Sequence, residues 1–203
     1  MSDLASFLSE LTANTSEQWD WPTIGQRFDV SGYLTSVDPP LYLVVSVRAI
    51  AMRGGEVFVF ESEGSTHAIP GGRREPGESP DAALAREIRE ETGCAIVGTP
   101  RPLGVLHLHN LSPQRHDPKY KYPYPDTLQW VFVAEVAGDA TPSEDPFVDE
   151  GRFVSVEEAR RSLASPAERL FVEAAIASRS VGIPRTSPRG RPDSRARGRP
   201  TRP

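Results

Sequence analysis

The segment from Gly72 to Cys94 constrains the fold of this chain more than any other part of it. Ser79-Pro80 predicts a helix start, because a serine hydroxyl can cap a free amide and proline fits the first helical position. Alanine, leucine and charged residues then run without a helix breaker from Asp81 to Glu91. Gly93 stands where a helix ends in a left-handed turn, which glycine adopts at little cost. The sequence therefore predicts a helix over roughly Pro80 to Thr92.

This predicted helix gathers acidic side chains on one side. At about 100° per residue, Glu87, Glu90 and Glu91 fall within one arc, and Leu84 and Ile88 form the neighbouring apolar stripe. Like charges at such spacings cost a few tenths of a kcal/mol per pair, and a divalent cation would reverse the sign. Magnesium suits such a cluster, because it takes hard oxygen ligands and bridges to substrate phosphates.

Three further groups complete the candidate site. Glu78 lies just before the helix, and Arg86 flanks the acidic arc, where it can hold a carboxylate by a two-pronged hydrogen bond. Pro70-Gly71-Gly72 is expected to form a turn that brings main chain close to an ion, so that a carbonyl there is a further ligand. The alternative is a solvated acidic helix face. Agreement at seven specified polar or glycine positions favours a site.

The pattern Gly72-x5-Glu78-x7-Arg86-Glu87-Ile88-x-Glu90-Glu91-x-Gly93-Cys94 resembles, position by position, the signature of the Nudix hydrolase family. The resemblance implies an α/β fold, the Nudix-type α/β/α sandwich with a mixed sheet. It also implies hydrolysis of a diphosphate bond in a nucleoside diphosphate linked to another group. Two positions depart from the family pattern: His67 stands where tryptophan is common, and Arg74 occupies an apolar position. Both are therefore predicted to bear on substrate binding.

The resemblance also assigns roles to individual residues. Magnesium, with manganese as an alternative, would be held by Gly72, Glu78, Glu87, Glu90 and Glu91, and Arg86 would orient a carboxylate. The general base is left open between Glu87 and a carboxylate of a later loop. Four residues of that loop are candidates, of which Glu150 is best placed; they are Glu144, Asp145, Asp149 and Glu150.

Substrate choice is expected to depend on residues outside the motif. The long segment between Asn110 and Asp126 carries tyrosines among prolines, whose rings either stack on a base or cover the apolar surface of the domain. His107 and His109 share one face of a predicted strand, from which one of them would reach phosphate or ribose. A structural zinc site is not expected there, because no third ligand stands at suitable spacing. The predicted substrate-binding set is His67, Arg74, His107, His109, Tyr122 and Tyr124.

The remaining sequence predicts strands before and after the motif helix, and helices at the end of the domain. A hairpin turn at Arg53-Gly54-Gly55 joins the first two strands. The predicted strands are 41–50, 56–61, 66–69, 102–109, 127–136 and 151–155, and the predicted helices are 156–163 and 166–179. The Nudix domain would span residues 41–178. It follows an N-terminal extension, residues 1–40, in which a short helix over 3–11 precedes several aromatic residues that pack on the main domain or on a partner subunit.

The charge of the chain is divided unevenly. The 203 residues carry a net charge of −5, but from Arg179 onward there are eight arginines and one acidic residue. This tail, residues 179–203, is rich in arginine, proline, glycine and serine, cannot bury a core and is predicted to be disordered. Binding of nucleic acid through the tail is the weaker hypothesis. A lone cysteine excludes an internal disulfide, and the absence of a signal segment or apolar span predicts a cytoplasmic protein with no membrane contact.

Three functions remain open at this point. The first is a magnesium-dependent pyrophosphohydrolase acting on a small-molecule nucleotide diphosphate, such as a nucleotide sugar like ADP-ribose or a nucleoside triphosphate. The second is a non-catalytic nucleotide-sensing module, and the third is an RNA-end hydrolase that uses the arginine tail. The full set of carboxylates favours the first, because a pure binder does not need all four. Dimerisation is common in the family, which favours a homodimer.

Overall fold

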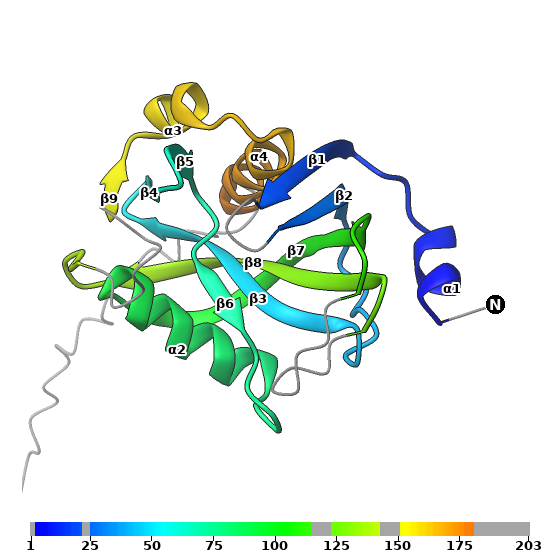
Figure 1. The fold of residues 1–203 in the computed structure, drawn as a ribbon. Coiled ribbons are helices and arrows are strands. Elements are labelled where there is room, and N and C mark those ends of the chain that lie inside the picture. Colours follow the sequence, from blue (N-terminus) through cyan, green and yellow to red (C-terminus); the bar gives the residue numbers. More distant parts are fainter. Residues whose placement is uncertain (1–2, 22–24, 115–122, 143–150, 181–203) are drawn as a thin grey trace, which may run out of the picture.

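The computed structural model describes residues 3–21, 25–114, 123–142 and 151–180, and these form a curled mixed sheet with helices on both faces (Figure 1). The strands run in the order β1-β2-β7-β8-β3-β4-β5, with β6 paired to β3 and β9 paired to β4. Strands β3 and β8 are parallel, and the other paired strands are antiparallel. The bounds are β1 Thr15–Trp21, β2 Gln26–Leu34, β3 Val44–Arg53, β4 Glu56–Ser62, β5 Ser65–His67, β6 Gly71–Arg73, β7 Ala95–Asn110, β8 Asp126–Ala137 and β9 Gly151–Val154.

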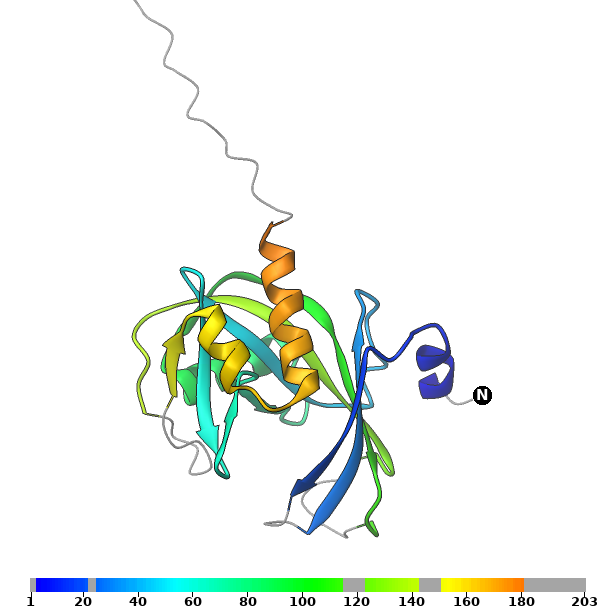
Figure 2. The same ribbon diagram turned by 90° about the horizontal axis from the view of Figure 1, so that it is seen from above.

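Within the described residues, four helices accompany the sheet, and three of them cover its faces. Helix α2 (Pro80–Thr92) lies on one face, and α3 (Val156–Ser162) and α4 (Pro166–Ser180) lie on the other (Figure 1). The view from above shows α3 and α4 lying over the sheet (Figure 2). Helix α1 (Asp3–Ser9) lies at the edge of the molecule and has no buried residue. In the described part of the chain, no helix is long and apolar enough to cross a membrane.

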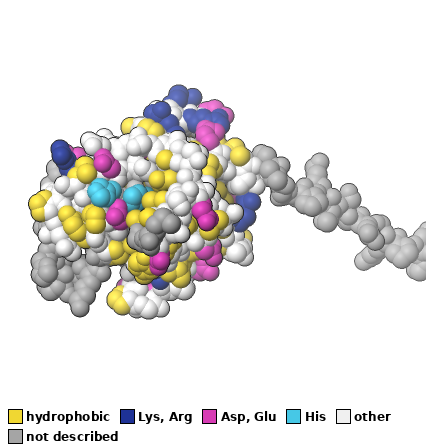
Figure 3. All heavy atoms as spheres, turned by 90° about the vertical axis from the view of Figure 1, so that its right-hand side faces the viewer, with side chains coloured by type: hydrophobic (Ala, Val, Ile, Leu, Met, Phe, Trp, Pro, Cys, Tyr) yellow, Lys and Arg dark blue, Asp and Glu magenta, His cyan; other side chains and the backbone are white. Residues whose placement is uncertain are grey.

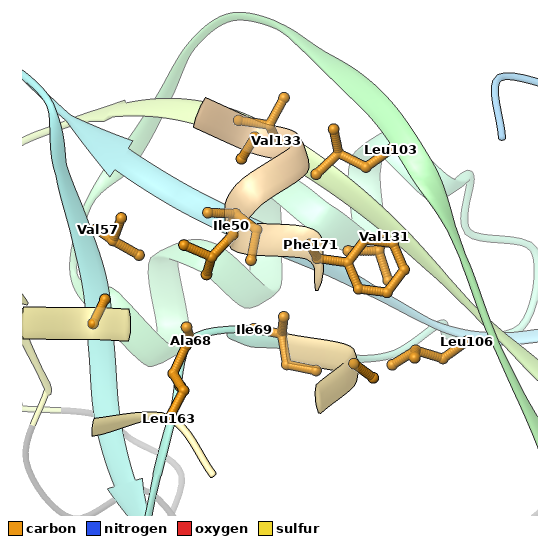
Figure 4. Close-up of a cluster of buried hydrophobic side chains, with 14 of the residues drawn as sticks. Ile50, Val57, Ala68, Ile69, Leu103, Leu106, Val131, Val133, Leu163 and Phe171 are labelled. Atoms are coloured by element: carbon orange, nitrogen blue, oxygen red, sulfur yellow. The ribbon is translucent and has the colours of Figure 1, made fainter. Parts of the chain in front are cut away.

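Alternating side chains of the same strands fill two cores, one under each helical layer. Under α2, Leu84 and Ile88 pack with Val47, Ala49 and Leu128. Under α4, Phe171 packs against residues of four strands and of the segment before β6 (Figure 4), which include Ile50, Val57, Ala68, Ile69, Leu103, Leu106, Val131 and Val133. The predicted sandwich of helix, mixed sheet and helix is confirmed.

The N-terminal segment is part of the sheet. Strand β2 pairs with β7 from Phe28 opposite Asn110 to Leu34 opposite Gly104, and β1 pairs with β2. Trp19 and Trp21 pack against the core under α4. Of the two expectations for these aromatic residues, the structure therefore shows packing on the main domain.

The predicted elements are present, with differences at their ends. Helix α2 has the predicted bounds, and the hairpin between β3 and β4 turns at Gly54-Gly55. Strand β3 lies three residues later than predicted, because its start at Leu41 is taken up by a turn. Strand β7 begins at Ala95 rather than Pro102, because register shifts between Val97 and Arg101 accommodate the glycine and proline residues there.

Candidate active site

Helix α2 is fixed at both ends by the groups that the sequence predicted. The Ser79 hydroxyl accepts a hydrogen bond from the Ala82 amide at 3.2 Å, and Gly93 has a left-handed φ of 73°. Leu84 and Ile88 are fully buried under the helix. The caps and the buried stripe together fix which side of α2 faces the sheet and where its acidic residues lie.

Arg86 lies at the centre of the acidic residues and contacts three of them. Its Nε and Nη2 atoms donate to the two oxygens of Glu78, both at 3.0 Å, which is the predicted two-pronged hydrogen bond. Its Nη1 donates to Glu87 Oε1 at 2.7 Å and to Glu90 Oε2 at 3.1 Å. The Arg86 hydrogen bonds lower the pKa of Glu78, and the Glu78 carboxylate in turn raises the pKa of Arg86. One guanidinium therefore holds three carboxylates in fixed rotamers.

The glycines before the helix bring main chain against two of these carboxylates. The structure shows a strand rather than the expected turn, because Gly71 and Gly72 pair with Arg48 and Val47 as part of β6. The Gly71 amide donates to Glu91 Oε2 at 2.7 Å, and Glu91 is only 6% exposed. A Cβ atom added at Gly72 would lie 2.6 Å from the carboxylate carbon of Glu87. Only glycine leaves room for that carboxylate.

The three principal carboxylates differ in their surroundings. The side chain of Glu87 is 12% exposed, whereas that of Glu90 is 42% exposed. Burial raises the pKa of Glu87, and the hydrogen bond from Arg86 opposes this rise without cancelling it. The environment of Glu87 therefore increases the proton affinity of its carboxyl group.

The donor set fits a hard divalent cation. Carboxylate and main-chain carbonyl oxygens are the ligands that magnesium prefers, and the absence of a side chain at Gly72 lets the Glu87 carboxylate lie against the main chain there. Among the described residues, no three His, Cys, Asp or Glu side chains converge as a ready-made metal site. In this structure, Arg86 Nη1 bridges Glu87 and Glu90.

The segment leading into β6 is held by a residue that sequence reasoning missed. Arg48 donates from Nη1 to the carbonyls of Ile69, at 3.1 Å, and Gly71, at 2.8 Å, and from Nε to Gln129 Oε1 at 2.9 Å. The sequence did contain a sign of this role, since Arg48 is a charged residue inside the apolar run of β3. An arginine is rare in such surroundings unless it is paired.

His67 and Arg74, the two departures from the family pattern, both make contacts within the protein. His67 Nδ1 lies 2.7 Å from Glu168 Oε1 of α4. Burial is the largest influence on the pKa of His67 and lowers it, but the hydrogen bond to Glu168 and the charge of that carboxylate together raise it, so that the net shift is upward. Arg74 donates to the carbonyls of three residues, namely Leu41, Val44 and Glu78. Contact with substrate by either residue stays a prediction.

The two strand histidines meet at an aspartate that was not foreseen. His107 Nε2 and His109 Nδ1 each lie 2.8 Å from Asp126 Oδ1. Burial is the largest single influence on the pKa of Asp126 and raises it, but the hydrogen bonds and charges of His109 and His107 together lower it below its usual value. Figure 3 shows histidine and acidic side chains together at the surface of this end of the sheet. The two histidines share one face of β7, as the alternation of side chains along a strand predicts. Leu106 and Leu108 point to the core under α4, so the histidines lie on the opposite face of the sheet, which is the face that α2 covers.

The remaining predicted residues lie partly outside the described part of the chain. Tyr124 is 44% exposed, and its hydroxyl donates to the Ser112 carbonyl at 3.1 Å. Tyr122 and the base candidate Glu150 lie outside the described residues, as does the arginine tail from residue 181. Their predicted roles stay predictions.

Comparison with known proteins places this geometry in a family. The family model described as NUDIX domain matches residues 42–174. No curated protein matches the chain. Among solved structures, a NUDIX hydrolase from Nitrosomonas europaea is 21% identical with a TM-score of 0.51, over 66% of this chain and 89% of that one. A pyrophosphohydrolase from Bacillus subtilis is 17% identical with a TM-score of 0.53, over 82% of this chain and 98% of that one.

At these identities the solved structures show a shared fold, whereas the family model covers most of the chain and includes every carboxylate of the α2 cluster. The chain therefore belongs to the Nudix hydrolase family, whose members are pyrophosphohydrolases that generally cleave diphosphate bonds in nucleoside diphosphates linked to other groups.

Proposed function

We propose that this enzyme hydrolyses the diphosphate bond of a small nucleotide derivative in a reaction that depends on magnesium. The leading substrate classes are nucleotide sugars, such as ADP-ribose, and nucleoside triphosphates. The observation that carries the proposal is the arrangement of Glu87, Glu90 and Glu91 on α2, against the glycines of β6 and around Arg86.

The contacts of each residue indicate its role. Glu87, Glu90 and Glu91, with a carbonyl at Gly72, would hold magnesium, which when bound neutralises the phosphate oxygens that gain charge. Glu78 has a supporting role, because both of its oxygens are taken up by Arg86. Arg86 orients the carboxylates and keeps them from repelling one another.

A base must accept the proton of the attacking water. Glu87 is a candidate, because its burial raises its pKa and so increases its proton affinity. Glu150 is the alternative in the loop before β9. The variant Glu150→Gln distinguishes the two, because Glu87→Gln would also remove a proposed metal ligand. If Glu150 is the base, Glu150→Gln lowers kcat and removes the acidic limb of the pH profile, whereas an unchanged profile favours Glu87.

The proposal is tested with a panel of nucleotide sugars and nucleoside triphosphates at varied magnesium and manganese concentrations. Phosphate or nucleotide release is expected for one class, and it should fall by at least about 100-fold in Glu90→Gln or Glu91→Gln. Glu173→Gln is the matched control, because Glu173 is an exposed carboxylate of α4 that pairs with Arg160. Nucleotide binding without turnover in either metal would refute hydrolysis and support a regulatory module.

A further inference from the structure

A buried carboxylate on the C-terminal helix contacts the segment that leads into β6. Glu168, in the first turn of α4, is 1% exposed. Its Oε2 accepts a hydrogen bond from the Ala68 amide at 2.6 Å, and its Oε1 lies 2.7 Å from His67 Nδ1. Neighbouring residues of α4 such as Phe171 are apolar and pack in the core beside Ala68 and Ile69 (Figure 4).

A buried carboxylate in this position is costly unless both of its oxygens have partners. Removing a carboxylate from water carries a large desolvation penalty, and apolar replacements of buried ion pairs are often equally stable. An apolar side chain would fit the pattern of the helix, which otherwise faces the core here. The contacts of Glu168 therefore call for an explanation beyond packing.

The contacts place Ala68–Gly71 between two buried carboxylates from opposite sides of the sheet. Glu168 of α4 accepts from the Ala68 amide at one end, and Glu91 of α2 accepts from the Gly71 amide at the other. Between them, Arg48 donates to the Ile69 and Gly71 carbonyls. Among the described residues, Arg48 also acts electrostatically on His67, the partner of Glu168.

Small displacements of this segment reach the proposed metal site directly. Gly72 follows it immediately, and an added Cβ there would already overlap Glu87. The fit between β6 and α2 is therefore tight, and whatever fixes the segment also fixes the carbonyl and carboxylates that would receive a cation.

We infer that Glu168 is a positioning residue, which acts through the Ala68 amide to hold the 68–72 segment in register with the carboxylates of α2. It does not touch the reacting groups. The inference rests on the proposed metal-dependent function and adds to it a link from the C-terminal helix to the metal-binding segment.

The experiment uses the full chain and three substitutions at one position. Glu168→Ala removes the acceptor, Glu168→Asp keeps the charge but withdraws the acceptor, and Glu168→Gln keeps an oxygen in place without the charge. Glu173→Ala is the matched control on the exposed side of α4. Binding of Mn²⁺ is measured by electron paramagnetic resonance without substrate, and hydrogen exchange is measured on the peptide that contains residues 67–72.

Glu168→Ala and Glu168→Asp are expected to weaken Mn²⁺ binding by about tenfold and to speed exchange in that peptide. Glu168→Gln and Glu173→Ala should stay within about twofold of the original protein. If Glu168→Ala does not fold, the comparison of Glu168→Asp with Glu168→Gln decides the question.

Lower melting temperatures with unchanged Mn²⁺ binding in Glu168→Ala and Glu168→Asp would overturn the inference, because a purely structural role predicts that result. A loss in Glu168→Gln as large as in Glu168→Ala would overturn it as well. Failure of the unsubstituted protein to bind Mn²⁺ would instead refute the proposed function itself.

Discussion

Replacing Gly72 by alanine should disable the site while leaving the fold intact. The added Cβ would lie 2.6 Å from the carboxylate carbon of Glu87, whereas carbon atoms in contact lie about 3.5 Å apart. The carboxylate must therefore move by about 1 Å, and it would lose its 2.7 Å hydrogen bond from Arg86. A misplacement of about 1 Å at a reacting centre can cost about 100-fold in rate, or about 2.7 kcal/mol in the barrier.

The assay is steady-state turnover of the best substrate from the nucleotide panel, alongside urea denaturation. The obstructing group is the end of a side chain that can rotate, so the free energy of unfolding should change by less than about 1 kcal/mol. Gly77→Ala is the first control. Gly77 has a φ of 82° with open space around it, so this variant tests backbone strain near the site without displacing a carboxylate.

Gly71→Ala is the second control and should behave in the opposite way. Its Cβ would overlap the main chain of Val47 and lie 2.7 Å from Arg48 Cα, at a φ of 138° that other residues rarely adopt. This variant should fail to fold stably. Retention of more than a third of the original kcat by Gly72→Ala would refute the placement of Glu87 in the reacting site.

Three other outcomes follow from the structure. Asp126→Asn removes a carboxylate whose pKa is lowered in the folded protein by His109 and His107. The stabilisation that this carboxylate contributes is therefore complete above about pH 4 and is lost as pH falls through the folded pKa. Urea denaturation from pH 7 to pH 3 should show the free energies of unfolding of the variant and the original protein converging at low pH. Phe171→Ala removes a fully buried side chain and should lower the free energy of unfolding by about 3–5 kcal/mol. Urea denaturation measures this change, and an unchanged midpoint would contradict the described core. Arg86→Lys keeps the charge but cannot hold Glu78 with two prongs, so kcat should fall by about 10- to 100-fold with little change in melting temperature.

Local signals predicted the motif helix and its acidic face. The Ser79 cap, Pro80 and Gly93 lie within the segment that they delimit, so the bounds of α2 followed from sequence alone. The apolar stripe of Leu84 and Ile88 likewise fixed which side of the helix is buried. Arg86 was expected to hold one carboxylate, and helical spacing alone did not indicate that it reaches three.

Contacts between distant residues could not be predicted in this way. Strand β2 alternates buried and exposed residues, but its position in the sheet depends on pairing Phe28 with Asn110, which no local pattern specifies. Glu168 contacts Ala68, which lies 100 residues away in the sequence. From the sequence alone, an acidic residue near the start of a helix is interpreted as stabilising the helix dipole. His67 and Arg74 were singled out for substrate binding, which stays a prediction, and their partners within the protein were not foreseen.

The order of strands in the sheet also has a consequence for synthesis of the chain. Residues 15–34 leave the ribosome before their pairing partner in β7, which ends at Asn110. Until then, β2 presents an open edge together with Phe28 and the tryptophans of β1, which are the features that promote association between chains. Chains that stop before residue 104 should therefore aggregate or be captured by chaperones, whereas the hairpin finds its partner within the same molecule once β7 has been made.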